Sequence, residues 1–136
     1  MENCQFCEFE DQQAVIYTDE LCFAAISRKP INKYHVMVIP KVHHENFVDL
    51  SDDLAAHIFI VAKKLSYAVR KACHPAAIMH VSDDEVSKKG YNLVSHYKFH
   101  LIPRFEDDNI VIDYHREEDP GIEDRARFAA EIRAEM

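Results

Sequence analysis

Residues 94–104, which read Val-Ser-His-Tyr-Lys-Phe-His-Leu-Ile-Pro-Arg, constrain the fold more than any other segment of the chain. Their β-branched, aromatic and apolar side chains predict a buried strand that ends at Pro103. Alternate side chains of a strand share a face, so His96, Lys98 and His100 lie together on one side. The residues between them form the opposite, packing face: Tyr97, Phe99 and Leu101. At a rise of about 3.3 Å per residue the two outer histidines are about 13 Å apart, which makes a shared metal ion difficult.

Short apolar runs elsewhere in the chain predict further strands. The first two strands are joined in a hairpin around Asp19 and Glu20, and Pro40 ends the third. The four predicted strands cover residues 14–17, 21–26, 35–39 and 76–81. A polar loop is expected at 82–90 and a further short strand at 110–112.

Two segments have helical periodicity. Ser51 is a candidate N-cap, and the apolar residues that follow it recur at helical spacing for about six turns, up to the break at residues 73–75. A final helix is predicted over 122–135, with these apolar residues turned inward: Ile122, Phe128, Ala129 and Ile132. A sheet of antiparallel strands with a central helix belongs to the α+β class.

Composition limits the possible functions. The 136 residues fit one domain, 1–136, with a single core. A net charge of -8 has the wrong sign for binding a nucleic-acid polymer, and two glycines exclude a Walker A loop and a dinucleotide fingerprint. No apolar run approaches the roughly 20 residues of a membrane span, and the N-terminus lacks the pattern of a secretory signal. We therefore expect a cytoplasmic protein that neither spans nor binds a membrane.

Four segments resemble the histidine triad family, whose signature strand reads His-φ-His-φ-His-φ-φ, with φ apolar, often followed by Pro-Arg. The other three are the Cys-x-x-Cys pair at 4–7, the strand pair at 17–23 and the segment 35–43, His-Val-Met-Val-Ile-Pro-Lys-Val-His. They occur in family order over residues 4–105, whereas 106–136 holds an acidic segment and the last helix. The resemblance implies a five-stranded antiparallel sheet with one long helix, and a homodimer formed through that helix and neighbouring strands.

The cysteine pair indicates a metal site. In a cytoplasmic protein, a Cys-x-x-Cys pair is more often a metal or redox motif than a disulfide. The resemblance completes a zinc site with the four ligands Cys4, Cys7, His43 and His96. Such a Cys2His2 set forms a closed structural site with no open position for substrate. Two alternatives remain: Cys4 and Cys7 are free thiols, or the neighbouring His44 replaces His43.

The centre of the signature differs from the family, because Lys98 stands where the family has its nucleophilic histidine. A neutral imidazole attacks phosphorus near pH 7, whereas a lysine with an ordinary pKa near 10.4 is an ammonium ion without a lone pair. Ala25 likewise replaces the aspartate that would accept hydrogen bonds from ribose, and Tyr34 replaces a glycine and is expected to narrow the pocket. We therefore expect weak or absent hydrolysis of nucleotide phosphoramidates and dinucleotides.

The resemblance still implies a ligand site for a purine nucleotide or another small phosphorylated molecule. The expected ligand-binding residues are His35, Ile26, Asn92, Lys98 and His100, of which Lys98 and His100 also occupy the catalytic positions. A lysine ammonium and a histidine N–H can together hold a phosphate. Two other functions remain open: a nucleotidyl hydrolase or transferase that uses Lys98 covalently, and a structural or interaction module without a small ligand.

Overall fold

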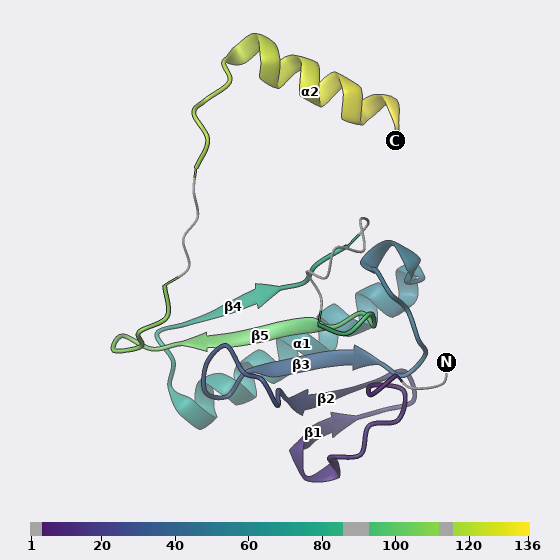
Figure 1. The fold of residues 1–136 in the computed structure, drawn as a ribbon, viewed down its shortest axis with the longest axis vertical. Helices are drawn as coiled ribbons and strands as arrows, with labels where there is room; N and C mark the ends of the chain where they lie inside the picture. The colour runs from purple at the N-terminus through teal and green to yellow at the C-terminus, as the bar shows by residue number, and fades with distance from the viewer. Residues whose placement is uncertain (1–3, 86–92, 112–115) are drawn as a thin grey trace.

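The computed structural model describes residues 4–85, 93–111 and 116–136 (Figure 1). A five-stranded antiparallel sheet with strand order β1-β2-β3-β5-β4 forms its centre. The strands are β1 (Val15–Thr18), β2 (Cys22–Ile26), β3 (Val36–Pro40), β4 (Ala77–Val81) and β5 (Phe99–Arg104). The helices are α1 (Asp52–Cys73) and α2 (Ile122–Ala134), with 3-10 turns at Gln12–Ala14 and Phe47–Asp49. The predicted α+β class and the five-stranded sheet are confirmed.

Helix α1 covers one face of the sheet (Figure 1). Ser51 Oγ accepts a hydrogen bond from the Leu54 N–H and caps the helix, which ends at His74 in the left-handed conformation. The buried side of the helix presents Ile58, Val61, Ala62, Leu65 and Val69. This helix therefore follows the predicted cap, periodicity and end.

The other face of the sheet has its own apolar cluster, and this face carries the candidate site. Alternation along β2 and β3 sends Ala24 and Val38 toward α1, and Ala25 and Met37 toward the opposite side. There the N-terminal segment packs Phe6 onto the sheet. The complete second cluster is Phe6, Phe23, Ala25, Met37 and Ile39.

Asp19 ties the β1–β2 hairpin to α1. Its carboxylate accepts hydrogen bonds from the backbone N–H groups of Leu21 and Cys22, from the Tyr17 hydroxyl at 2.7 Å and from His57 Nε2 at 2.7 Å. Burial alone would raise the pKa of Asp19, but these hydrogen bonds together hold it well below its usual range. The charged carboxylate of Asp19 thus stabilises the predicted turn between β1 and β2.

The signature strand starts later than predicted. β5 begins at Phe99, so His96 and Lys98 lie in the irregular segment before it, and β3 pairs with β5 only at Phe99, His100 and Leu101. The predicted alternation nevertheless holds, because the core under α1 takes these residues: Tyr97, Phe99 and Leu101. Pro103 lies inside the strand, beyond the last β3 pair, where its carbonyl accepts a hydrogen bond from Asn32.

Helix α2 contradicts the prediction of an inward apolar face. It lies apart from the sheet, beyond the β4 edge (Figure 1), and none of its residues is buried. Ile122 is 77% exposed, Ile132 66% and Phe128 42%. Ile110 and Val111 are not in a strand either, and Ile112 lies outside the described residues. In the part of the chain that the structure describes, neither helix has the length and apolar character needed to cross a membrane.

Candidate functional site

The face of the sheet opposite α1 carries a pocket of about 730 Å³. Most of its lining comes from three segments, the N-terminal residues 4–11, the loop after β2 and the residues 93–100 around the start of β5, and Met37 of β3 and Asp83 complete it. His35, Lys98 and His100, which were predicted to bind ligand, all line it. The structure therefore brings Lys98 and His100 of the segment 94–104 together with His35 in one cavity.

His35 and His100 form a hydrogen-bonded pair at the bottom of this pocket. His35 Nδ1 accepts from the Ile31 backbone N–H at 3.0 Å, so the proton of a neutral His35 lies on Nε2. Nε2 is 2.8 Å from His100 Nδ1 and donates to it. His100 is consequently left with a proton on Nε2, as a donor for an anion. Burial lowers the pKa of His35, and burial together with His35 and Lys98 lowers the pKa of His100 to about 4.

Lys98 is held by the backbone that precedes it. Its Nζ donates to the Val94 carbonyl at 2.9 Å and to the His96 carbonyl at 3.1 Å, and it lies 5.7 Å from the centre of the Phe6 ring. Burial lowers the pKa of Lys98, while the charge of Asp83 acts in the opposite direction. Two carbonyl acceptors and an aromatic face stabilise an ammonium ion more than a neutral amine. The geometry therefore favours a charged Lys98 that anchors the segment 94–96.

The four predicted metal ligands converge beside the pocket. Cys4 Sγ lies 3.3 Å from His96 Nδ1, Cys7 Sγ lies 3.5 Å from His43 Nδ1 and 3.7 Å from His96 Nδ1, and all four donor atoms lie within 4.8 Å of one another. Zn–S and Zn–N distances of about 2.3 and 2.0 Å in a tetrahedron require S···N edges of about 3.5 Å. The cluster contains His43 and not the alternative His44. The donor set and its spacing thus fit a tetrahedral metal ion.

His96 is oriented for this role by a second hydrogen bond. Its Nε2 lies 2.8 Å from the Pro40 carbonyl and donates to it, which leaves the Nδ1 lone pair directed at the cysteines. Burial is the main cause that lowers the pKa of His96 to about 4, so the imidazole is neutral at ordinary pH. A neutral imidazole with a fixed tautomer is the form that binds a metal.

Other predicted residues lie elsewhere. Ile26 packs against the α1 side of the sheet, because alternation along β2 puts it opposite Ala25, so the expected ligand contact does not hold in this geometry. Ala25 is fully buried in the second apolar cluster and offers no group to a ribose. Asn92 lies outside the described residues. Tyr34 does not line the pocket, so it does not narrow the pocket as predicted. Its φ of 61° is a left-handed conformation, which favours the glycine that the family has at this position.

The pocket also has charged residues that the sequence did not single out. Arg28 and Lys29, in the loop after β2, line it together with Ser27, and four carboxylates also line it: Glu8, Glu10, Asp11 and Asp83. In the sequence Arg28 and Lys29 stand out only as two adjacent cations after a predicted strand. Charged residues are common in surface loops, so this pattern alone did not indicate a pocket. Arg104, by contrast, is fixed away from the pocket: its guanidinium donates to the Asp108 carboxylate at 2.9 Å.

Comparison with known proteins places the chain in a family. The HIT domain model matches residues 8–107, and the chain belongs to the HIT (histidine triad) family. A crystal structure of a HIT family member from Bacillus subtilis superposes with a TM-score of 0.88 at 28% identity, covering 99% of this chain and 98% of that one.

Two further similarities concern activity and metal. The bis(5'-adenosyl)-triphosphatase of Dictyostelium discoideum is 28% identical over 128 residues, which cover 90% of this chain and 85% of the relative. A Zn-bound histidine triad family protein from Mycobacterium smegmatis superposes with a TM-score of 0.69 at 25% identity, covering 98% of each chain. Relatives of this chain thus include a nucleotide hydrolase and a zinc-bound protein.

Proposed function

We propose that this HIT protein contains structural zinc, binds a nucleotide or another small phosphorylated ligand, and hydrolyses phosphoramidates and dinucleotides weakly or not at all. One observation carries the proposal: Lys98 occupies the place of the nucleophile and is bonded to two backbone carbonyls. An ammonium ion in this position has no lone pair for attack on phosphorus. It can still attract a negative charge.

Anion binding is supported by the other groups in the pocket. The hydrogen-bonded pair leaves His100 Nε2–H as a donor, Lys98 supplies a buried charge beside it, and Arg28 and Lys29 add charge to the loop. Charge-assisted hydrogen bonds of this kind are the strong ones in phosphate sites. The fully buried Ala25 leaves the ribose without a carboxylate, so we expect the phosphate to supply most of the affinity.

Cys4, Cys7, His43 and His96 would hold the zinc ion. With four protein ligands the ion supplies a cross-link and no catalytic chemistry. The cross-link joins the N-terminal segment to the residues after β3 and to those before β5, and this holds Phe6 against the sheet and residues 4–11 at the pocket wall. We further propose a cytoplasmic location, because a reducing compartment keeps such a cysteine pair available for metal.

The second candidate function is covalent catalysis by Lys98. Burial lowers the pKa of this lysine, which is the direction that would release a nucleophilic amine.

We also propose a homodimer that pairs through α1 and the neighbouring strands. Its support is that Phe59, Ile60 and Tyr67 of α1 are each more than half exposed.

Adenosine phosphoramidate distinguishes these functions. We expect saturable binding, turnover far below about 1 per second, and no adduct on Lys98 in intact-mass spectra. Turnover at about 1 per second or faster would contradict the proposal, and a nucleotidyl adduct that Lys98→Met abolishes would establish the second candidate. Failure to bind adenosine phosphoramidate, AMP and inorganic phosphate would leave a structural or interaction module.

A further inference from the structure

Cys4 and Cys7 lie in one tight turn near the N-terminus. The backbone N–H groups of Cys7 and Glu8 both donate to the Cys4 carbonyl, at 3.0 and 3.1 Å. The Sγ atoms of the two cysteines lie within 4.8 Å of each other in the proposed zinc site. Rotation of the two side chains in such a turn brings the sulfurs to the length of a disulfide bond, about 2.05 Å. The same two sulfurs therefore suit a metal when they are reduced and each other when they are oxidised.

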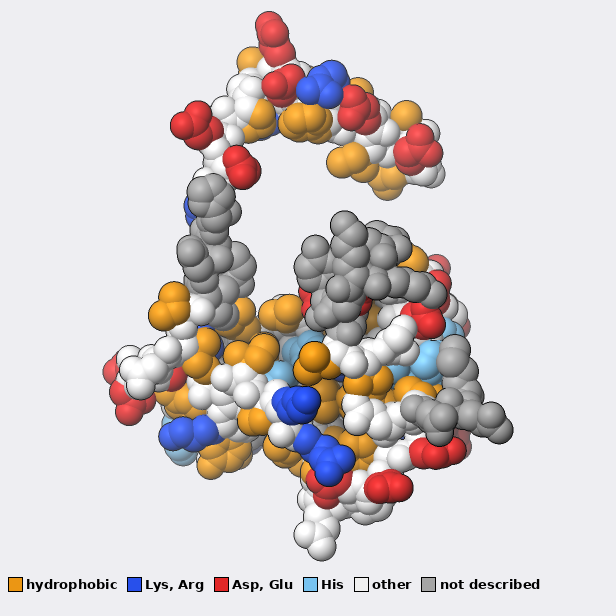
Figure 2. Space-filling model, viewed as in Figure 1, with side chains coloured by type: hydrophobic (Ala, Val, Ile, Leu, Met, Phe, Trp, Pro, Cys, Tyr) orange, Lys and Arg blue, Asp and Glu red, His pale blue; other side chains and the backbone are white. Residues whose placement is uncertain are grey.

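The chemical state of the four cysteines favours oxidation at this pair. Cys22 is fully buried, and burial raises the pKa of its thiol to about 12. Burial also raises the pKa of Cys73, whose Sγ donates to the Val69 carbonyl at 3.3 Å. Oxidants attack thiolates, and a bound metal ion keeps its cysteine ligands in the thiolate form. Cys7 is exposed, and Figure 2, viewed from the face of the sheet opposite α1, shows histidine side chains (pale blue) at the surface.

The N-terminal segment 4–11 is attached to the sheet by its side chains. Among the residues that the structure describes, its backbone hydrogen bonds stay within the segment or reach the 3-10 turn at Gln12–Ala14. Phe6 and Phe9 pack in the second apolar cluster, and the cysteine pair supplies two of the metal ligands. Loss of the metal therefore leaves this segment with its apolar contacts alone.

Oxidation of the cysteines also leaves too few ligands for the metal. A disulfide removes both thiolates, and two imidazoles do not make a tetrahedral structural site. His96 Nε2 keeps its hydrogen bond to the Pro40 carbonyl at 2.8 Å. His43 Nε2, in contrast, is buried and has no hydrogen-bond partner in the described part of the chain. The metal would thus be what fixes His43 and the N-terminal segment, whereas the ring of His96 is fixed without it.

Phe6 connects the cysteine turn to the phosphate pocket. Its buried ring lies edge-on to the His96 ring, with centroids 5.8 Å apart, and Lys98 Nζ lies 5.7 Å from its centre. Residues 4–11, which include Phe6, form one wall of the pocket. If this wall moves away, water reaches Lys98 and the histidine pair, and their attraction for an anion weakens because the local dielectric constant rises.

The same wall also carries groups that repel an anion. These are three exposed carboxylates: Glu8, Glu10 and Asp11. Water and salt already screen exposed charges, so the departure of these carboxylates restores less affinity than the exposure of Lys98 removes. The net effect of a loosened wall is therefore weaker binding of a phosphate.

We propose that Cys4 and Cys7 are an oxidation site, at which a peroxide converts the metal-binding dithiolate into a disulfide, releases the metal and loosens the wall of the phosphate pocket. This inference rests on the proposed zinc and phosphate sites, and it adds that the first controls the second.

The oxidation takes two steps and two electrons. The Cys7 sulfur attacks one peroxide oxygen, the O–O bond breaks, and hydroxide leaves a sulfenic acid on Cys7. The Cys4 sulfur then attacks the Cys7 sulfur, the S–S bond forms, the S–O bond breaks, and a second hydroxide leaves. Two protons from solvent convert both hydroxides to water. The two sulfurs supply the electrons that reduce the peroxide, and zinc leaves as Zn²⁺ without a change of oxidation state.

Titration with hydrogen peroxide tests the oxidation site. A chromogenic zinc indicator follows the metal, and intact-mass spectra after alkylation count the free thiols. We expect release of one zinc per chain, loss of two of the four thiols, a Cys4–Cys7 disulfide in peptide maps, and reversal by a thiol reductant with added zinc. Cys73→Ser should behave like the wild type, because Cys73 lies outside the cluster. Zinc that stays bound in excess peroxide, or oxidation at Cys22 or Cys73 instead, would overturn the inference.

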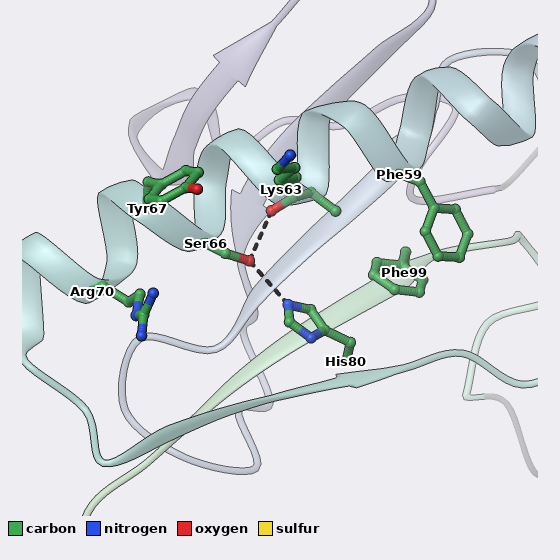
Figure 3. Close-up of a pocket in the computed structure, with 8 residues that line it drawn as sticks. Phe59, Lys63, Ser66, Tyr67, Arg70, His80 and Phe99 are labelled. Atoms are coloured by element: carbon green, nitrogen blue, oxygen red, sulfur yellow. Dashed lines mark hydrogen bonds between the residues drawn. The ribbon is translucent and has the colours of Figure 1, made fainter.

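Limited digestion with chymotrypsin, which cuts after aromatic residues, tests whether only the wall loosens. Cleavage after Phe9 should be at least about tenfold faster in the oxidised protein than in the reduced, zinc-loaded protein. Phe59 and Tyr67 are the internal control, because both are more than half exposed on α1 (Figure 3) and should stay uncut in either form. Equal rates after Phe9 would show that the wall stays in place, and new cuts in α1 would show that the whole fold opens. Either result would overturn the inference.

Calorimetric titration of AMP tests the control of the pocket. We expect the oxidised protein to bind AMP about tenfold more weakly than the reduced, zinc-loaded protein. Equal or higher affinity in the oxidised protein would overturn the inference and leave the proposed function standing. A reduced, zinc-loaded protein that does not bind AMP would overturn both.

Discussion

Loss of the metal cross-link should lower the stability of this protein by a large and measurable amount. Cys4 and His96 are 92 residues apart in sequence, yet their donor atoms are 3.3 Å apart. In the chain-entropy model, a cross-link that closes a loop of this length contributes about 4–5 kcal/mol to the free energy of unfolding. For a chain of this size that corresponds to a fall in melting temperature of about 15 °C when the link is lost.

The perturbation is Cys7→Ser, because Cys7 is exposed and its replacement removes a thiolate without disturbing the core. Cys73→Ser is the control, since Cys73 is also a free cysteine but lies outside the cluster. We expect one zinc per chain by plasma mass spectrometry in the wild type and in Cys73→Ser, and none in Cys7→Ser. Adding a chelator to the wild type should lower its melting temperature by the same amount as the change Cys7→Ser does.

Three results would refute this reasoning. The first is a wild type that purifies without stoichiometric zinc. The second is a wild-type melting temperature that does not change when the chelator is added. The third is a loss of stability in Cys73→Ser as large as that in Cys7→Ser. The last result would mean that any cysteine change destabilises this fold, and that the short donor distances reflect packing alone.

Three further predictions concern single positions. Lys98→His alone should restore little phosphoramidate hydrolysis in a steady-state assay, because Ala25 still leaves the ribose unanchored and the phosphate misplaced. A misplacement of about 1 Å can lower the rate on the order of a hundredfold. Recovery to about 1 per second would contradict this prediction. Because burial lowers the pKa of His100 to about 4, its contribution to stability should be complete above about pH 6.5 and be lost as the pH falls toward 4. Urea unfolding of His100→Gln should accordingly show a pH slope smaller by up to about 1.4 kcal/mol per pH unit in that window, and an unchanged slope would contradict it. Tyr34→Gly should raise the free energy of unfolding by about 1 kcal/mol, because Tyr34 has a φ of 61°; a fall in stability would mean that the tyrosine ring makes the larger contribution.

The sequence predicted the architecture well where local signals and burial agree. Helix α1 has a capping serine, a regular apolar stripe and the break at residues 73–75, and each of these signals is local. The alternation of residues 96–101 also placed Lys98 and His100 on the face opposite Phe99, although the strand itself begins only at Phe99. Strand length depends on which residues pair with a neighbouring strand, and the pairing between β3 and β5 ends at Phe99, although β3 itself continues to Pro40. That information is absent from the segment itself.

The remaining differences have the same physical origin. Periodicity identified the apolar residues of α2, but a periodic pattern does not say which surface covers it, and in the structure no part of the described chain does. Arg28 and Lys29 reach the pocket because the loop after β2 turns toward it, and no local signal encodes that turn. The metal ligands were predicted only through family resemblance, since the sequence distance from Cys4 to His96 gives no indication that they meet.

The most direct test of the proposed function is calorimetric titration of AMP into the zinc-loaded protein and into its Lys98→Met variant. We predict saturable binding to the wild type and at least about a tenfold loss of affinity in the variant, because a buried ammonium that pairs with phosphate contributes more than about 1.4 kcal/mol. Bound zinc and the melting temperature of each protein should be measured in the same preparations, so that a folding defect is recognised. Equal affinity in the two proteins, or no binding to the wild type at millimolar AMP, would contradict the claim that Lys98 has become an anion-binding residue.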